Sequence, residues 1–581
     1  MRRRRIAVLT ALAALAALTL AIPGARADAR VTETGYITVS DGTLLNYTVV
    51  RPAVSNDPAH RAPTLFEYSG YEPGLVPDAG YVARYVPKGY AYIGVNLRGS
   101  GCSGGTWDFF SPREAKDGAE VVEWIARQKW SNGRVAMIGK SYPGITQLFV
   151  AAQRPPHLVA IAPGHTYGDI YRDVAYPGGI FNYSFAALWS FVAQPGQSYP
   201  HAFQLAAQGD ATCAQHLATR TAPSLRYNPF VQAQEHPWDD ALIEERSPIY
   251  LVDRIDVPVW TVAAWQDEQV GPKAVDWFPH LRRDLLHGIV TNGDHGMYRT
   301  EPAMQRLDAF LDHFVRGVDN GFPDEGPDLR VWWEAGRDGT RAPGWQTTIA
   351  AWPPPQATTW RVHLPDGAPD AFAYAGPTGQ GIPNARYSSV VSQPDVYFDQ
   401  APAPGTAVTY TTGPLTSDVT VLGSASVDLW IASTAPDTDL QVTITEIRPD
   451  GLEQFVQQGW LRASHRALDP AHSTETQPYQ THEQADQQLL SPGEPTPVRV
   501  EVFPFGHVFR KGSRIRLWVE GPKAVPDLWG FAALPVPATN VVYHDAAHPS
   551  SIAFSVLPGV RAPLALAACD TVIRQPCRPA G

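Results

Sequence analysis

One serine stands in a context that favours nucleophilic chemistry. Ser141 lies in the run Gly139-Lys140-Ser141-Tyr142-Pro143-Gly144, directly after a strand predicted over 135–138 and before a predicted helix. A strand, a tight turn with small neighbours and a helix form a nucleophile elbow, which exposes the hydroxyl at the carboxyl edge of a sheet. Pro143 replaces the second glycine of the common G-x-S-x-G pattern, so an ordinary strand-to-helix turn is the competing interpretation.

A nucleophilic serine needs a base and an acid that orients the base. In sheets that carry such an elbow, the acid and then the base follow the serine along the chain, each just after a later strand. Asp267 follows the strand predicted over 259–264, and His295 follows the strand predicted over 285–291. Glu268 and Asp294 are rival acids. Asp267 is preferred, because the side chains of adjacent residues such as Asp294 and His295 diverge.

The charge that develops on an attacked carbonyl oxygen needs two hydrogen-bond donors. The backbone N–H of Tyr142, which follows the serine, is the expected first donor. The loop after the predicted strand 64–68 lacks a run of glycines, so a tyrosine hydroxyl is the natural second donor. Tyr71 lies beyond that strand and is preferred to Tyr68, which still belongs to it.

The elements that would position these residues alternate along the first half of the chain. Apolar runs predict buried strands at 64–68, 90–96, 135–138, 158–162, 259–264 and 285–291, with helical patterns at 114–129, 145–153 and 302–315. This alternation predicts an α/β fold, with a mostly parallel sheet covered on both faces. Between about 165 and 247 the alternation stops, which indicates an inserted cap over the sheet edge.

The sequence pattern changes near Asp324. Apolar and polar residues alternate there, and Pro449-Asp450-Gly451 supplies a turn between two such runs. This pattern predicts an all-β sandwich or jelly roll. The expected organisation is a processing segment at 1–27, a catalytic domain at 28–324 and a β domain at 325–581.

Composition excludes several classes of protein. Of the 581 residues, 44% are hydrophobic and only 18% are charged, which excludes a disordered chain. The 46 Lys and Arg against 57 Asp and Glu give a net charge of −11, which argues against nucleic-acid and anionic-membrane partners. A homo-oligomer is left open.

The N-terminal segment has the features of an export signal. Arg2–Arg5 are followed by an apolar stretch to Ile22 and by the A-x-A site Ala25-Arg26-Ala27. Cleavage before Asp28 is preferred to a membrane anchor, because the apolar stretch is shorter than the ~20 residues that span a bilayer. We therefore expect a secreted or cell-envelope protein, by either the general or the twin-arginine route.

Four cysteines fit an oxidising compartment, and their spacing is unlike that of a zinc site. Cys569 and Cys577 are expected to form a disulfide near the C-terminus, which leaves Cys102 and Cys213 to pair over a long loop. Four free thiols are the alternative.

Four segments together resemble the cocaine esterase and Xaa-Pro dipeptidyl-peptidase family of serine hydrolases. They are 139–144 around Ser141, 98–105 (RGSGCSGG), 167–173 (YGDIYRD) and 506–513 (GHVFRKGS). The last segment lies in the predicted β domain, so both halves of the chain point to one family. The resemblance implies an α/β-hydrolase domain with an inserted helical cap, followed by a C-terminal β jelly-roll domain.

The resemblance also implies residue roles that agree with the positional analysis. Ser141 matches the nucleophile, Asp267 the acid, His295 the base and Tyr71 the tyrosine of the oxyanion hole, with the N–H of Tyr142 as the other donor. The reaction would pass through an acyl-enzyme and would need no metal and no organic cofactor.

The family fixes the reaction but not the substrate. Members cleave esters or amides, so cocaine-esterase-like hydrolysis of a small ester, amide or short peptide is expected, with Xaa-Pro dipeptidyl-peptidase or α-amino acid ester hydrolase activity as the alternative. Asp169 and Asp173 are candidates for binding a substrate amine, although Asp173 beside Arg172 equally suits an internal ion pair. Candidates for an apolar acyl pocket, each of which could instead only pack, are Trp265, Tyr176, Phe181 and Trp189.

A hypothesis from another class is a secreted, non-catalytic binding protein, because jelly-roll domains often bind carbohydrate. The chemically competent residues at all four catalytic positions argue against it.

Overall fold

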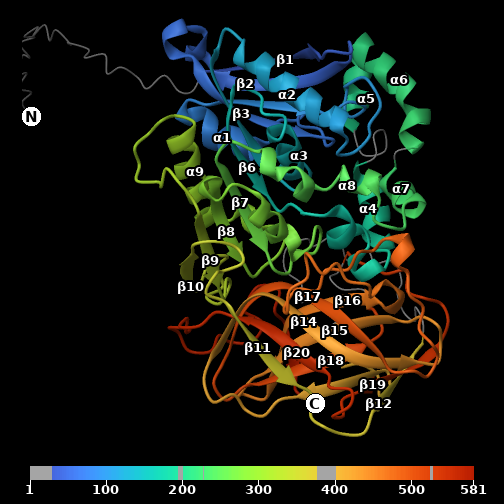
Figure 1. The fold of residues 1–581 in the computed structure, drawn as a ribbon. Helices are drawn as coiled ribbons and strands as arrows, with labels where there is room; N and C mark the ends of the chain where they lie inside the picture. Colours follow the sequence, from blue (N-terminus) through green and yellow to red (C-terminus); the bar gives the residue numbers. More distant parts are fainter. Residues whose placement is uncertain (1–28, 194–199, 227, 376–400, 524–527) are drawn as a thin grey trace, which may run out of the picture.

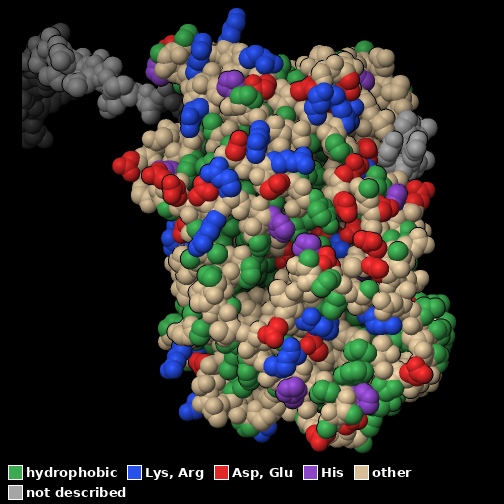
Figure 2. All heavy atoms as spheres, viewed as in Figure 1, with side chains coloured by type: hydrophobic (Ala, Val, Ile, Leu, Met, Phe, Trp, Pro, Cys, Tyr) green, Lys and Arg blue, Asp and Glu red, His purple; other side chains and the backbone are tan. Residues whose placement is uncertain are grey.

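The structure is a computed structural model that describes residues 29–193, 200–226, 228–375, 401–523 and 528–581. The predicted export signal at 1–27 lies outside the described residues. Across the described ranges, no helix is both long and apolar enough to cross a membrane. On the face drawn in Figure 2, basic side chains are interspersed with acidic ones and do not form one continuous basic band.

The first half of the chain builds a ten-stranded mixed sheet (Figure 1). The central strands are parallel, as their buried and β-branched runs predict, and only the pairings at the two ends are antiparallel. In spatial order the strands are β1 (Arg30–Thr38), β2 (Leu44–Pro52), β4 (Ala91–Asn96), β3 (Ala62–Ser69), β5 (Ser131–Lys140), β6 (Leu158–Gly164), β7 (Val259–Ala264), β8 (Leu286–Thr291), β9 (Asp328–Trp333) and β10 (Trp345–Ile349).

Helices cover both faces of this sheet, which confirms the predicted α/β architecture. Apolar side chains of α2 (Pro112–Ala126) and α3 (Tyr142–Ala151) belong to one buried cluster, and those of α1 (Ala79–Tyr85) and α9 (Glu301–Phe314) belong to a second. Because α1, α2 and α9 each bury one side against the sheet and α3 is buried on every side, the strand ends are held in fixed register.

The insertion between β6 and β7 is helical and lies along one side of the sheet (Figure 1). Its helices are α4 (Tyr183–Ala193), α5 (Pro200–Ala207), α6 (Ala211–Arg226), α7 (Pro229–Glu235) and α8 (Ala241–Glu244). A disulfide joins Cys102, in the loop after β4, to Cys213 of α6, so the insertion is covalently tied to the sheet domain. This pairing was one of the two expected from the sequence.

The second half is an antiparallel sandwich of two sheets, as the alternating pattern predicts. Alternate residues such as Val427, Leu429 and Ile431 are buried between the sheets. One sheet contains β11 (Thr358–His363), β20 (Ser551–Val556), β14 (Val419–Ser433), β19 (Ala538–Tyr543), β12 (Asp370–Tyr374) and β17 (Thr496–Phe509); the other contains β13 (Ala407–Thr411), β18 (Arg514–Glu520), β15 (Asp439–Ile447), β16 (Leu452–Arg462) and β21 (Cys577–Pro579).

The chain terminus is anchored to this sandwich. Cys577 forms the second expected disulfide, with Cys569, and begins β21, which pairs with β16. The sheet of the first domain, in turn, continues past residue 324, where the sequence analysis ends the catalytic domain. The strands β9 and β10 complete it, because β9 pairs in parallel with β8.

The two domains share a polar and aromatic interface. Lys273 of the first domain donates to Glu501 of β17 at 2.8 Å, and the side chain of Gln457 of β16 donates to the backbone oxygen of Trp265 at 2.8 Å. The β domain therefore contacts the segment that follows β7, where Asp267 lies.

Candidate active site

Ser141 occupies a strained turn between β5 and α3. Its φ of 64° and ψ of −133° lie in a region that side chains rarely adopt, and its N–H donates to the oxygen of Gly164 at 2.8 Å. The turn needs small neighbours, because a Cβ on Gly144 would lie 2.5 Å from that same oxygen. The strained turn leaves Ser141 half-buried at the N-terminus of a helix.

Asp267 and His295 meet at the carboxyl ends of β7 and β8. Nδ1 of His295 lies 2.8 and 2.9 Å from the two carboxylate oxygens of Asp267. The side chains are 4% and 1% exposed, respectively, so the pair is withdrawn from water. The Asp267 carboxylate also accepts from the backbone N–H groups of Gln269 and Val270, at 2.9 and 3.1 Å, which fix its orientation.

Electrostatics favour a carboxylate beside a neutral imidazole. Burial alone would raise the pKa of Asp267, but His295 and His165 hold that pKa well below its usual range. Burial lowers the pKa of His295, and the negative charge of Asp267 only partly opposes this effect. The remaining ring nitrogen, Nε2 of His295, is buried and has no hydrogen-bond partner among the described residues.

The loop that carries His295 is held from three sides. Nζ of Lys140, adjacent to Ser141, donates to the backbone oxygen of His295 at 2.9 Å. Glu268 accepts from the backbone N–H of His295 at 3.0 Å and lies 3.6 Å from Arg574. Asp294 pairs with Arg341. Both rival acids are thus engaged away from the imidazole, and the bond from Lys140 holds the serine turn beside the histidine loop.

The predicted oxyanion tyrosine and its rival differ in their surroundings. The hydroxyl of Tyr68, which is 1% exposed, donates to the backbone oxygen of Glu114 at 3.2 Å. Tyr71 is half-buried, and its ring meets that of Tyr142 edge-on with centroids 5.4 Å apart. Trp189 of the cap donates from Nε1 to the Tyr71 hydroxyl at 3.3 Å. The cap therefore touches the residue proposed to complete the site.

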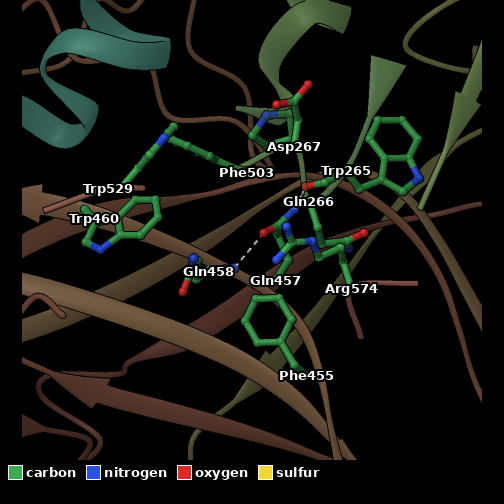
Figure 3. Close-up of a pocket in the computed structure, with 11 residues that line it drawn as sticks. Trp265, Gln266, Asp267, Phe455, Gln457, Gln458, Trp460, Phe503, Trp529 and Arg574 are labelled. Carbon is green, nitrogen blue, oxygen red and sulfur yellow. Dashed lines mark hydrogen bonds between the residues drawn. The ribbon is translucent and has the colours of Figure 1, made fainter. Parts of the chain in front are cut away.

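A pocket of about 360 Å³ lies where the two domains meet behind Asp267. Figure 3 shows aromatic side chains from the β domain and the segment after β7 around it. The residues that line it are Trp265, Gln266, Asp267, Pro272, Phe455, Gln457, Gln458, Trp460, Phe503, Trp529 and Arg574. Trp265, a predicted pocket residue, thus lies at this junction, where it also stacks on Trp352 with centroids 5.5 Å apart.

The other predicted pocket residues divide into two places. Trp189 packs beside Tyr71 and Tyr142, whereas Tyr176 and Phe181 stack on each other in a separate cluster at the base of the cap. Tyr176 also donates to the backbone oxygen of Ala233 at 2.7 Å, so its hydroxyl is used internally.

The two candidate amine-binding carboxylates are both engaged within the protein. Asp169 accepts from Arg172 at 2.6 Å. Asp173 accepts from the backbone N–H groups of Gly168 and Asp169, at 2.7 and 2.9 Å, and lies 3.8 Å from Nζ of Lys273. Asp173 is thus within ion-pair distance of Lys273 rather than Arg172, although burial still raises the pKa of Asp173 well above its usual range.

One residue of the site escaped the sequence analysis. Nδ1 of His165 lies 2.7 Å from Asp267, on the carboxylate oxygen that also accepts from His295. His165 comes directly after β6, in the same post-strand position that identifies Asp267 and His295. The same positional rule points to His165. It was not predicted, because residue 165 was treated only as the start of the insertion.

His165, Asp267 and His295 also form the one group among the described residues whose metal-ligand atoms lie within 4.8 Å of one another. Their N···O separations of 2.7 to 2.9 Å are those of charge-assisted hydrogen bonds. Because the backbone N–H of Tyr298 donates to Nε2 of His165, both ring nitrogens of that histidine are occupied. The group therefore suits a proton-sharing cluster rather than a cation site.

Comparisons with known proteins identify the family of the chain. Residues 41–297 match the model of the X-Pro dipeptidyl-peptidase (S15) family, and residues 320–553 match its C-terminal non-catalytic domain. A protein of Mycobacterium bovis named as a serine esterase is 27% identical over 90% of this chain and 95% of its own length. The cocaine esterase of a Rhodococcus species is 26% identical over 75% of this chain and 81% of its own.

A solved structure extends the likeness to the fold. A CocE/NonD family hydrolase from Staphylococcus aureus superposes with a TM-score of 0.71, at 23% identity, over 91% of this chain and 94% of that one. The two matched models lie side by side along the chain and cover both domains. The chain therefore belongs to the cocaine esterase and X-Pro dipeptidyl-peptidase family of α/β-hydrolase serine hydrolases.

Proposed function

We propose that the protein is an exported serine hydrolase that cleaves a small ester through Ser141, His295 and Asp267. The observation that carries the proposal is the buried Asp267–His295 pair, at 2.8 Å, on a loop that Lys140 ties to the strained Ser141 turn. His295 takes the proton of Ser141 on Nε2, Ser141 attacks the carbonyl carbon, and His295 then protonates the leaving group. Water repeats the cycle on the acyl-enzyme.

The oxyanion of the tetrahedral intermediate is held by the hydroxyl of Tyr71 and the backbone N–H of Tyr142. Tyr71 suits this role better than Tyr68, because the Tyr68 hydroxyl is spent on the oxygen of Glu114. The Nε1–H of Trp189 donates to the Tyr71 hydroxyl at 3.3 Å, so the cap helps to position the hydroxyl that is proposed to bind the oxyanion.

An ester is favoured over a substrate with a free amino group. A buried ammonium group needs a carboxylate partner, and the two carboxylates proposed for that role are already paired, Asp169 with Arg172 and Asp173 with Lys273. Xaa-Pro dipeptidyl-peptidase or α-amino acid ester hydrolase activity is the second candidate, because the matched family model carries the former name.

A panel of aryl esters, aminoacyl esters and Xaa-Pro anilides tests the proposal. We expect the highest kcat/KM on an aryl ester without an amino group. Turnover of Xaa-Pro anilides in preference to all esters would replace the ester proposal by the peptidase one. Export is tested separately by N-terminal sequencing of protein secreted by its own host, which should begin near Asp28.

A further inference from the structure

His165 is placed to act on the catalytic carboxylate. It follows β6 with a φ of 49°, in the left-handed region that few residues other than glycine adopt, and its side chain is fully buried. Nδ1 of His165 lies 2.7 Å from Oδ2 of Asp267, and Nε2 lies 3.1 Å from the backbone nitrogen of Tyr298. The strained backbone thus holds a ring whose two nitrogens both have fixed partners.

These two partners determine where the proton of His165 resides. The backbone N–H of Tyr298 can only donate, so Nε2 of His165 must accept and carries no proton. A neutral ring then holds its proton on Nδ1 and donates it to Asp267. The two contacts therefore assign the donor to Nδ1 and the acceptor to Nε2.

We propose that His165 is a positioning residue for the reaction: its Nδ1–H fixes Oδ2 of Asp267 against His295 and limits the negative charge that His295 experiences. The inference rests on the proposed function, in which His295 is the base. Asp267 then receives four N–H donors, two from imidazoles and two from backbone amides. A carboxylate bound in this way can neither rotate nor leave the imidazole, and its charge is shared between two rings.

The surroundings of His295 make the contribution of His165 measurable. The charged groups around the His295 loop, besides Asp267 and His165, include Lys140, Glu268, Asp294, Arg299, Arg341 and Arg574. Lys140 and Glu268 bond the backbone of His295, and Asp294 pairs with Arg341. Among the described residues, His165 is therefore the one side chain besides His295 that donates to Asp267.

Two variants test the roles of the two ring nitrogens of His165 separately. His165→Gln offers an amide oxygen in place of Nε2, which keeps an acceptor for Tyr298 and removes the donor to Asp267. His165→Asn offers an amide N–H in place of Nδ1, which keeps the donor and removes the acceptor. We expect His165→Gln to lower kcat about 10- to 100-fold with KM within about twofold, and His165→Asn to restore most of kcat.

The pH dependence of kcat/KM distinguishes positioning from mere packing. Without the Nδ1–H donor, the charge of Asp267 is less neutralised and stabilises protonated His295 more strongly. The acidic limb of the profile should therefore move to higher pH, by about half a unit or more, in His165→Gln but not in His165→Asn. Thermal melting of both variants reports their folding in the same samples.

Two results would overturn the inference. One is a His165→Gln enzyme with wild-type kcat and an unmoved acidic limb. The other is an equal loss of activity and melting temperature in both variants with the limb unchanged, which would make His165 a packing residue. Failure of wild-type protein to react at Ser141 with an organophosphonate would instead refute the proposed function itself, so the two failures are distinguishable.

Discussion

Two buried carboxylates, one in each domain, show how the hydrogen-bond partners of a carboxylate determine whether its cluster can exchange a proton. Glu453 of β16 is 1% exposed and bonds Arg578 at 3.1 Å and Arg516 at 3.2 Å. Asp267 is equally buried but bonds imidazoles and backbone amides. In both cases burial would raise the pKa, and the partners lower it below the usual value.

The partners differ in whether they can exchange a proton. A guanidinium keeps its charge at every accessible pH, so the cluster around Glu453 is a fixed ion network that ties β16 to β18 and β21. An imidazole can take up and release a proton near neutral pH, so the cluster around Asp267 can support general-base chemistry. Of these two carboxylates, Glu453 is therefore suited to stabilising the sandwich, and Asp267 is suited to the proposed reaction.

We expect the largest effects when each of the two carboxylates is replaced by its amide. Asp267→Asn should lower kcat by about 10⁴-fold with little loss of stability, because the amide cannot stabilise a protonated His295. Glu453→Gln should leave kcat of the folded protein near normal but cost about 3 to 5 kcal/mol of unfolding free energy, because it removes the negative charge that faces two largely buried guanidinium groups. Steady-state kinetics and urea unfolding of both variants check this, and a stability loss in Asp267→Asn as large as that in Glu453→Gln would erase the contrast.

A second pair of variants compares a tyrosine proposed to act in the reaction with a structural tyrosine of the same domain. Tyr71→Phe should lower kcat about 10²- to 10³-fold, because the oxyanion that its hydroxyl binds is fully developed only in the tetrahedral state. KM should change little. Tyr68→Phe is the matched control, since that hydroxyl bonds only a helix carbonyl. Normal kcat in Tyr71→Phe together with a loss in Tyr68→Phe would move the donor to residue 68.

We expect a smaller difference, in stability alone, between removal of one disulfide and removal of the other. Cys102–Cys213 closes a loop of 111 residues between sheet and cap, whereas Cys569–Cys577 closes only 8 residues of the tail. In the chain-entropy view, their removal costs about 5 and less than about 3 kcal/mol, respectively. Paired Cys→Ser variants compared by thermal unfolding measure the difference. Equal melting temperatures in the two double variants would show that loop length does not govern these bonds.

The smallest expected effect is in the pH profile. Burial lowers the pKa of His295 below its usual 6.5, so the neutral base persists into mildly acidic solution. Activity is therefore present above that lowered pKa and is lost as the pH falls through it. An unperturbed imidazole titrates at about pH 6.5. The acidic limb of kcat/KM should therefore lie below pH 6.5. A limb above pH 7 would mean that Asp267 outweighs burial, or that another group is the base.

Much of this organisation is readable from the sequence because it follows local rules. The runs at 135–138, 259–264 and 285–291 are buried strands, and the side chains that follow them gather at one sheet edge, as parallel pairing requires. The alternation in residues 427–431 likewise predicts the sandwich. The cap could be identified only as an interruption of the pattern, since its helices are held by contacts with the rest of the domain.

Other features depend on long-range contacts that no local pattern encodes. The strands β9 and β10 join the first sheet from beyond residue 324, because β8 has an open edge there. The pairing of Asp173 with Lys273 brings together residues one hundred positions apart. The bond from His165 to Asp267 depends on the adjacency of β6 and β7, two strands that the whole cap separates in sequence.

Covalent labelling of the nucleophile tests the central claim most directly. Organophosphonate-treated protein, digested and mapped by mass spectrometry, should carry its adduct on Ser141 alone, because only a serine activated by His295 is nucleophilic enough. His295→Ala protein should label at Ser141 at least about 10³-fold more slowly. An adduct on another residue, or labelling of Ser141 at the wild-type rate without His295, would contradict the account.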